Sequence, residues 1–379
     1  MINKIIKYLH LSPLAYKLER MKVKNTKTEM TAAEALEYLH TVSSDPQNSC
    51  IYEHHWSETD CDVEVIIPCY KVEKYVEECV NSVLSQQTQY SYHVTLVNDG
   101  SPDHTREILR QYEELPNVTI IDQENRGLSG ARNTAINQAH GRYLLFLDSD
   151  DMLLPGALEA FMQMATKSNA DIVDSGHLSF ADPHTTNTLP RKLKKLVCDV
   201  LLKPQTFDDV EDAPTIKGLP WGKAIKREMF QNVQFPEGYW FEDTLVWMIL
   251  ESSAKKLSTI SKITTHYRMN PGSIGHVATG RGKSLDSFYV TMQLLRDRQK
   301  LGIQFNQKQY DYLLLQMKAN MGRIDSMPVE VKRALFVLQH DLIVNNFSDW
   351  HADKPKEKEI EKLICENRFE EFSLYCKWF

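Results

Sequence analysis

An apolar run that ends abruptly in three carboxylates constrains this chain more than any other feature. Residues 142–151 read RYLLFLDSDD, so Asp148, Asp150 and Asp151 directly follow five apolar residues. Such a run predicts a strand buried on both faces, as in a parallel sheet covered by helices. Sheets of this kind bind ligands beyond the carboxyl ends of their strands. We therefore expect the three acids to lie at a binding site.

The spacing of these acids indicates a metal. Side chains alternate along an extended chain, so Asp148 and Asp150 are expected to point the same way. Adjacent carboxylate oxygens suit Mg²⁺ or Mn²⁺, which often bridges to substrate phosphates. The competing interpretation is that Ser149, Asp150 and Asp151 only turn the chain into a helix, with Asp151 as its N-cap. Because that interpretation does not explain why three acids cluster, we favour a functional site.

Other strands are predicted before and after this one, and they alternate with helices. The predicted strands cover residues 63–67, 93–97, 118–121 and 171–174. Apolar residues recur at helical spacing from Val76 to Leu84. After the second strand, Ser101 and Pro102 are expected to be the N-cap and the first residue of a helix. The alternation favours an α/β domain with a mostly parallel sheet.

Seven segments in a fixed order resemble the motifs of family 2 glycosyltransferases. They are IIPCYK at 66–71, VNDGSPD at 97–103, NRGLSGARN at 125–133, LDSDD at 147–151, WGK at 221–223, FPEGYWFED at 235–243 and YRMNPGS at 267–273. One such motif is weak, whereas seven in order are specific. The resemblance spans residues 62–275, and its departures from the family pattern, at Cys69 and Lys71, do not affect the proposed chemistry.

The resemblance implies the GT-A fold, a Rossmann-like architecture with a mostly parallel central sheet flanked by helices. It also implies a nucleotide-sugar donor, with Tyr70 stacked on the base and Asp99 accepting a hydrogen bond from the ring N–H, which favours uridine. The residues implied to bind the donor are Pro68, Tyr70, Asp99, Arg126, Asp148, Ser149, Arg268 and Ser273. Each has a plainer alternative, since Asp99-Gly100 is also a common turn pair and Tyr70 could be a core aromatic.

The resemblance also assigns catalytic, metal and acceptor roles. Asp150 is implied to ligate Mn²⁺ or Mg²⁺, with His276 either an additional ligand or a solvated loop residue. One of Glu242 and Asp243 is implied to be the single general base, and we choose Asp243; a single base means direct displacement with inversion. Glu242 and Trp221 are implied to bind the acceptor, although Trp221 could equally be a core residue. Acids at 242 and 243 would also stabilise a helix start.

Composition is typical of an intracellular enzyme. The 379 residues include 44 Lys and Arg and 51 Asp and Glu, a net charge of −7, so nucleic acid is not an expected partner. Seven cysteines form no CxxC pair, which indicates reduced thiols. No apolar run approaches the ~20 residues that span a bilayer, and no secretory signal is evident. We expect a cytoplasmic protein.

The sequence predicts three parts. The first is a basic, partly helical N-terminal extension at residues 1–61. The second is the GT-A domain at residues 62–283, with a nucleotide-sugar half at 62–180 and an acceptor half at 181–283. The third is a helical region at residues 284–379. Residues 1–28 contain seven Lys or Arg and one Glu, a net charge of +6. They form either a helix at anionic lipid or a solvated helix packed on its own domain. The C-terminal helices either pack on the catalytic domain or form a homodimer surface.

The expected activity is inverting, metal-dependent transfer from a UDP-sugar to a glycan or lipid-linked acceptor hydroxyl, in bacterial polysaccharide or cell-surface glycan synthesis. The enzyme would work in the cytoplasm or at the inner face of the membrane. A sugar-phosphate nucleotidyltransferase is one alternative, but it is expected to carry a Gly-rich phosphate loop after the first strand. A non-catalytic glycan-binding relative is another, but it would have lost acids that are all present here.

Overall fold

The computed structural model describes residues 11–25, 29–181, 203–214, 218–269 and 280–379, which belong to two compact units. The sheet unit comprises Asn48–Ser273 and Met292–Ile303. The helical unit comprises Met1–Gln47, Ile274–Thr291 and Gln304–Phe379. The expected site residues that are described all lie in the sheet unit, whereas Ser273 and His276 lie outside the described residues.

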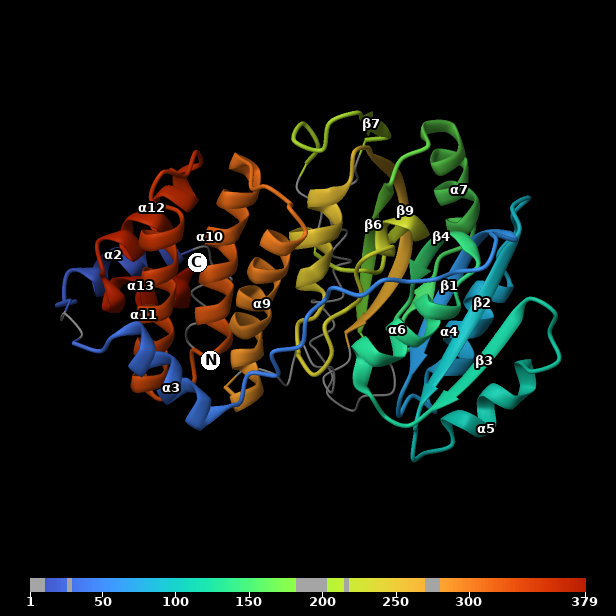
Figure 1. Ribbon diagram of the computed structural model, residues 1–379, viewed down its shortest axis with the longest axis horizontal. Coiled ribbons are helices and arrows are strands. Elements are labelled where there is room, and N and C mark those ends of the chain that lie inside the picture. The colour runs from blue at the N-terminus through green and yellow to red at the C-terminus, as the bar shows by residue number, and fades with distance from the viewer. Residues whose placement is uncertain (1–10, 26–28, 182–202, 215–217, 270–279) are drawn as a thin grey trace. The chain divides into compact units, whose positions relative to one another are not determined.

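The sheet unit is built on one mixed sheet (Figure 1). The strands are β1 (Cys61–Cys69), β2 (Tyr92–Asp99), β3 (Val118–Gln123), β4 (Gly141–Phe146), β5 (Met152–Leu153), β6 (Ile172–Ala181), β7 (Gln205–Phe207), β8 (Lys223–Lys226) and β9 (Leu257–Met269). They lie in the order β3-β2-β1-β4-β8-β6-β9-β5, and β7 pairs with β9. The pairs from β3 to β4 and the pair β6–β9 are parallel, whereas β8 is antiparallel to both of its neighbours. The five predicted strands are thus confirmed as parts of β1, β2, β3, β4 and β6.

Helices cover both faces of the parallel strands. They are α4 (Val76–Leu84), α5 (Thr105–Leu109), the 3₁₀ turn η1 (Arg110–Tyr112), α6 (Gly127–Gln138) and α7 (Ala157–Ser168). Alternate residues of β1, such as Val63 and Val65, form one core with apolar residues of α4 and α7. Helix α6 packs on β1 and β2, and its buried residues lie outside that core, which places it on the opposite face. This layering is the expected α/β architecture.

The helix after β2 begins later than the sequence predicted. Instead of Ser101 serving as N-cap, α5 begins at Thr105. The Ser101 hydroxyl donates to the backbone oxygen of Cys69 at 3.3 Å. One Asp103 oxygen accepts from the Thr105 N–H at 3.2 Å and the other from the Glu73 N–H at 3.3 Å. These bonds hold the turn against the end of β1 and delay the helix.

The competing interpretation, in which Asp151 caps a helix, does not agree with the structure. A short strand, β5, follows this residue, and α7 starts after Gly156, which has a left-handed φ of 73°. Oδ1 of Asp151 instead accepts a 2.7 Å hydrogen bond from the backbone N–H of Arg268 in β9. The acid therefore links the turn before β5 to β9.

The described residues between β8 and β9 include a short 3₁₀ helix, η3 (Arg227–Phe230), and a π-helical segment, η4 (Val246–Glu251). The segment that contains η4 is helical from Thr244, so the predicted apolar helix after Asp243 is confirmed. Its π geometry is a feature often found near functional sites.

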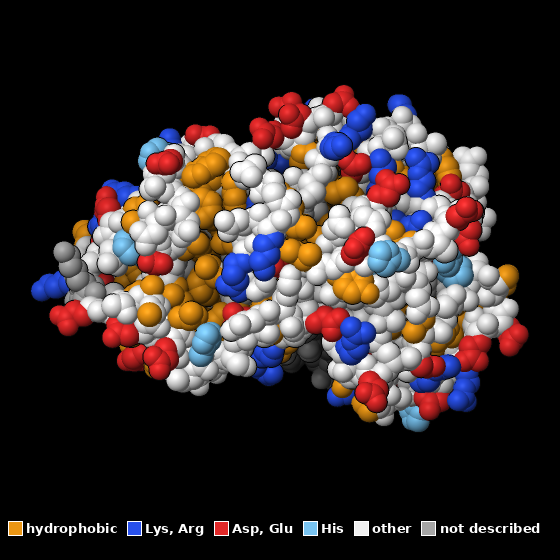
Figure 2. Space-filling model, in the orientation of Figure 1, with side chains coloured by type: hydrophobic (Ala, Val, Ile, Leu, Met, Phe, Trp, Pro, Cys, Tyr) orange, Lys and Arg blue, Asp and Glu red, His pale blue; other side chains and the backbone are white. Residues whose placement is uncertain are grey.

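The helical unit contains the helices expected near both ends of the chain. They are α2 (Ser12–Arg20), α3 (Ala32–Val42), the 3₁₀ turn η5 (Gly282–Leu285), α9 (Asp286–Lys300, whose second half belongs to the sheet unit), α10 (Gln307–Arg323), α11 (Val329–Asn346), α12 (Pro355–Cys365) and α13 (Phe369–Trp378). Helix α2 packs on α13, where the Tyr16 ring lies edge-on to Tyr375 at 5.7 Å. Acidic and basic side chains are interspersed over both units on the face shown in Figure 2. Among the described residues, no helix is both long and apolar enough to cross a bilayer.

Candidate functional site

Parallel pairing brings the carboxyl ends of β1, β2 and β4 to one edge of the sheet. Asp99, the last residue of β2, is only 2% exposed. Its Oδ1 accepts hydrogen bonds from the backbone N–H of Arg126 at 2.8 Å and from Nε2 of Gln123 at 2.6 Å. Both donors come from the loop and strand that precede α6. The Asp99 carboxylate is thus fixed in orientation.

An aromatic ring, that of Tyr70, follows the end of β1, the strand that pairs with β2. Pro68 is buried and pairs in register with Val97 of β2. Tyr70, two residues later, is 42% exposed, and Nζ of Lys71 lies 5.0 Å from the centre of its ring. An exposed ring at the end of a strand can stack on a planar ligand such as a nucleotide base. The alternative that Tyr70 is a core aromatic does not agree with its exposure.

The DSDD segment forms a tight turn directly after β4. The Asp151 N–H donates to the backbone oxygen of Asp148 at 2.9 Å. Ser149 and Asp151 are buried, whereas the Asp148 side chain is partly exposed. Burial, and then the charges of Asp150 and Asp148, raise the pKa of Asp151 well above its ordinary value.

The chemistry of this turn fits a divalent cation. Oδ2 of Asp151 is buried without a hydrogen-bond partner among the described residues. Three neighbouring carboxyl groups concentrate negative charge at this turn, and a hard cation with oxygen ligands would offset it. Asp150 and Asp148, which are less buried than Asp151, are the groups suited to hold it.

Arg268 braces the same turn from β9. Its Nε donates to the backbone oxygen of Asp150 at 2.7 Å, and its Nη2 lies 2.5 Å from Oε2 of Glu78 in α4. The guanidinium also lies over the rings of Phe180 and Tyr75, at 4.6 and 5.0 Å. Arg268 is therefore buried in contacts with the protein. In this arrangement it positions the DSDD backbone.

Arg132, a residue of α6 to which the sequence analysis gave no role, joins the two acidic motifs. Nη2 lies 2.9 Å from Oδ1 of Asp148, and Nη1 lies 2.6 Å from Oε1 of Glu242. Burial opposes the charged form, but the Asp148 and Glu242 carboxylates more than offset this and raise the pKa of the guanidinium. The ring of Phe235 lies 5.2 Å from it. One buried cation thus holds Asp148 and Glu242 together.

The loop that delivers Glu242 and Asp243 is docked on α6. Asn133 donates to the backbone oxygen of Phe235 at 2.8 Å and accepts from its N–H at 2.9 Å. Oε1 of Glu237 accepts from Nη2 of Arg126 at 2.6 Å and from Asn133 at 3.2 Å. Phe241, the residue before Glu242, has a left-handed φ of 67°. Glu242 is buried, whereas Asp243 is partly exposed.

Trp221 lies beside the end of β4, where it forms a bridge with Phe146. Its ring stacks on Tyr267 at 5.3 Å and meets the edge of His177 at 4.8 Å. With an exposed fraction of 7%, Trp221 belongs to an aromatic cluster that can offer only a small surface to a ligand.

Similarity to known proteins identifies the family of this chain. The sequence model of glycosyl transferase family 2 matches residues 64–234. The putative teichuronic acid biosynthesis glycosyltransferase TuaG of Bacillus subtilis is 30% identical over 214 residues, which cover 56% of this chain and 81% of TuaG. The chain belongs to glycosyltransferase family 2.

A longer relative and a solved structure are also similar to this chain. Glycosyltransferase GlyA of Streptococcus pneumoniae is 30% identical over 228 residues, but these cover 58% of this chain and only 32% of GlyA. Residues 1–349 of TarS from S. aureus, in complex with UDP-GlcNAc, superpose with a TM-score of 0.53 at 16% identity, covering 82% of this chain and 89% of that structure. The expectation of a GT-A fold is confirmed.

Proposed function

We propose that this chain transfers a sugar from a UDP-sugar to a hydroxyl of a glycan or lipid-linked acceptor during bacterial surface-glycan synthesis. The observation that carries the proposal is the buried Arg132, which contacts Asp148 and Glu242 at 2.9 and 2.6 Å. This contact draws the donor motif and the acceptor motif to one place. The relatives support the glycan class, since TuaG is named for teichuronic acid biosynthesis. The UDP-GlcNAc complex of TarS supports a UDP-sugar donor.

The donor would lie across the carboxyl edge of the sheet. Tyr70 would stack on the base, with Pro68 lining the same pocket, and Asp99 would accept the ring N–H of uracil. Its orientation by two protein donors at Oδ1 supports this role. Asp148 and Ser149 are assigned to the ribose. Arg126 is assigned to the base or phosphates.

Mn²⁺ or Mg²⁺ is the proposed cofactor, with Asp150 as its protein ligand. When bound, it stabilises negative charge on the departing diphosphate. Arg268 was expected to contact the phosphates. Its contacts with Asp150 and Glu78 favour the role of holding the turn that presents the carboxylates.

Transfer is proposed to be a single displacement. The acceptor hydroxyl oxygen attacks the anomeric carbon as the bond to the diphosphate breaks, and the hydroxyl proton passes to Asp243. One base opposite the leaving group gives inversion. Glu242 and Trp221 are proposed to bind the acceptor, and the contact between Glu242 and Arg132 would fix the acid in place. General-base catalysis of this kind contributes ~10²–10⁴ in rate.

We also propose that the enzyme acts in the cytoplasm, at the inner face of the membrane. Helix α2 packs its Tyr16 side against α13 and leaves an apolar stripe in solvent. The stripe consists of Leu11, Leu14, Leu18 and Met21, each at least 44% exposed. The exposed Lys17, Lys22 and Lys24 lie in the same segment. An apolar stripe with nearby lysines suits an anionic lipid surface, where a lipid-linked acceptor would be found.

The test is a screen of UDP-sugars for release of UDP that depends on both metal and acceptor. Asp150→Asn should abolish that release, while the circular dichroism spectrum stays that of the wild type. Near-normal turnover of this variant in Mn²⁺ or Mg²⁺ would remove the metal assignment. Release from none of the UDP-sugars tested, with lipid-linked and glycan acceptors both present, would contradict the proposed activity.

A further inference from the structure

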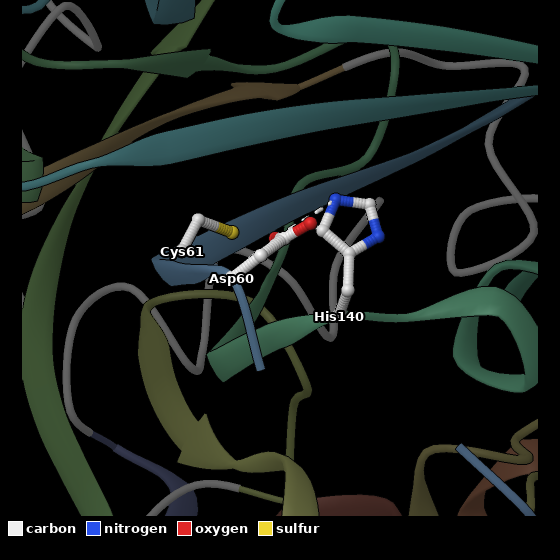
Figure 3. A group of neighbouring side chains, drawn as sticks. All are labelled: Asp60, Cys61 and His140. Atoms are coloured by element: carbon white, nitrogen blue, oxygen red, sulfur yellow. Dashed lines mark ion pairs between the residues drawn. The ribbon is translucent and has the colours of Figure 1, made fainter. Parts of the chain in front are cut away.

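A cluster of three side chains lies at the opposite end of β1 and β4 from the proposed donor site. Asp60 and Cys61 stand at the start of β1, and His140 immediately precedes β4 (Figure 3). Backbone pairing joins the two segments, since the Asp60 N–H donates to the His140 oxygen at 3.1 Å and Cys61 is in register with Gly141. His140 is far from Asp60 and Cys61 in the sequence, but the sheet brings it beside them. We propose that Asp60, Cys61 and His140 bind a transition-metal ion of the Zn²⁺ class and thereby clip β1 to β4.

The donor atoms are near the separation that such an ion requires. One ligand atom from each residue lies within 4.8 Å of the other two, and Nε2 of His140 is 3.6 Å from Oδ1 of Asp60. Zn²⁺ binds nitrogen and oxygen at ~2.0–2.2 Å and sulfur at ~2.3 Å in tetrahedral sites, so its ligand atoms stand roughly 3.3–3.8 Å apart. Small rotations of side chains are therefore sufficient. The Asp60 side chain is 70% exposed, which gives the ion access from solvent.

A buried carboxylate stands behind the histidine. Oε2 of Glu64 lies 3.9 Å from Nδ1 of His140, the ring nitrogen that faces away from Asp60. Glu64 is itself fixed, since Oε2 accepts from the N–H groups of His140 and Gly141 at 2.9 and 3.0 Å, and Oε1 from the Thr95 hydroxyl at 2.7 Å. A carboxylate behind a ligating histidine orients the ring and increases its basicity.

The backbone of the cluster is held from the other side by Arg227. Its Nη1 donates to the Ala139 oxygen at 2.5 Å, and its Nη2 to the Thr59 hydroxyl at 2.8 Å. These residues directly precede His140 and Asp60. The ring of His93 meets that of His140 edge-on at 4.5 Å. Both ligand-bearing segments are therefore in place before an ion arrives.

The ligand set selects the class of metal. One thiolate, one imidazole and one carboxylate suit Zn²⁺ or Co²⁺ and not Mg²⁺, which prefers oxygen ligands. The negative charges of Glu64 and Asp60, which lie beside the Cys61 thiol, would attract a dication. Binding would release the thiol proton to solvent. Three protein ligands leave a fourth position for water.

Cobalt provides a test that reports the thiolate directly. The full-length protein, stripped of metal with a chelator, is titrated with Co²⁺, and thiolate-to-cobalt charge-transfer absorption is recorded. We expect the band to saturate at one equivalent and to be lost when Zn²⁺ is added. Cys61→Ser should abolish the band. Cys365→Ser, which removes an exposed cysteine in α12, should leave it unchanged, and so should Asp150→Asn at the proposed donor-metal site.

Two further measurements complete the test. His140→Gln should weaken Co²⁺ binding at least ~10-fold, and Zn²⁺ should raise the thermal unfolding midpoint of the wild type but not of Cys61→Ser. Absence of the band from the wild type, or its persistence in Cys61→Ser, would overturn the proposal. Neither result bears on glycosyl transfer, because the two sites share no residue.

Discussion

Arg132 donates a 2.6 Å hydrogen bond from Nη1 to Oε1 of Glu242, a residue 110 positions further along the chain. The other guanidinium nitrogen contacts Asp148 at 2.9 Å. Because both acids depend on one buried cation, the position of either is tied to the other. The two halves of the proposed active site are thus held together by the Arg132 side chain, which need not touch either substrate.

Replacing Arg132 should damage both stability and turnover. Arg132→Met would leave Glu242 buried without its partner, and breaking a buried ion pair in this way costs ~3–5 kcal/mol. Urea unfolding followed by circular dichroism measures the loss. Arg142→Met is a matched control, because Arg142 is exposed and donates to the side chain of Asn169 in an exposed contact, so a change of at most ~0.5 kcal/mol is expected. Equal stability of the two variants would contradict a structural role for Arg132.

Arg132→Lys, which keeps the charge but not the forked geometry, should fold and still lower kcat.

The two neighbouring acids should respond differently to removal of charge. Asp243→Asn should lower kcat by ~10²-fold or more, because the amide cannot take the proton. UDP affinity should stay close to that of the wild type, since the base acts only as the acceptor attacks. Glu242→Gln should instead raise the acceptor KM and lower the thermal midpoint, because Arg132 loses a charged partner. Steady-state kinetics and calorimetry separate these effects. A dead Glu242→Gln with an active Asp243→Asn would reverse the assignment, and two active variants would reduce the motif to a charged helix start.

Asp99 should determine the choice of nucleotide. UDP is expected to bind more tightly than GDP or ADP, and Asp99→Asn should weaken UDP binding by about tenfold or more, as expected for a hydrogen bond to a charged group worth ~1.5–3 kcal/mol. Asp122→Asn, at the end of the adjacent strand β3, is the control and should leave the affinity unchanged. Isothermal titration calorimetry decides the matter. Equal affinity for UDP, GDP and ADP would remove the uridine assignment.

Introducing negative charge into the apolar stripe of α2 should abolish binding to membranes. Leu14→Glu together with Leu18→Glu is expected to prevent sedimentation with vesicles that contain phosphatidylglycerol. Neutralising Lys17, Lys22 and Lys24 should weaken binding by ~1 kcal/mol per charge and reduce its dependence on salt. Leu36→Glu changes an exposed leucine of α3 and serves as the control. If wild-type protein sediments equally with neutral vesicles, or with none, the proposed contact with anionic lipid is wrong.

Asp171 should make stability depend on pH in the acid range. Burial opposes its charge, but hydrogen bonds from Lys226 and from the N–H groups of Lys255 and Lys256 lower its pKa below the usual 3.8. A lowered pKa stabilises the fold above ~3.8, and that stabilisation is lost as pH falls through the folded-state value. Asp171→Asn should therefore be less stable than the wild type at pH 7. The difference should shrink toward pH 3 in urea titrations, and a difference that does not vary with pH would exclude this origin.

Sequence alone located the strands and one edge of the site, because both follow local rules. Buried strands appear as apolar runs, and polar residues at their ends, such as Asp99 and Asp148, converge once the sheet is parallel. The role of Arg132 was not predicted because a cation within a helix usually lies in solvent. The sequence also does not show that residues 235–243 fold back over α6. The capping role considered for Asp151 is wrong for a related reason, since the residue it contacts, Arg268, lies 117 positions away. Contacts of that range depend on tertiary packing.

The left-handed backbone of Phe241 has a consequence for engineering. A residue other than glycine is destabilised by ~1–2 kcal/mol in that conformation. Here the conformation lets Glu242 turn inward while Asp243 stays partly exposed. Relieving the strain with glycine would look attractive to anyone seeking a more heat-resistant protein. It would also free the peptide that separates the two acids, so thermal tolerance and turnover should move in opposite directions at this residue.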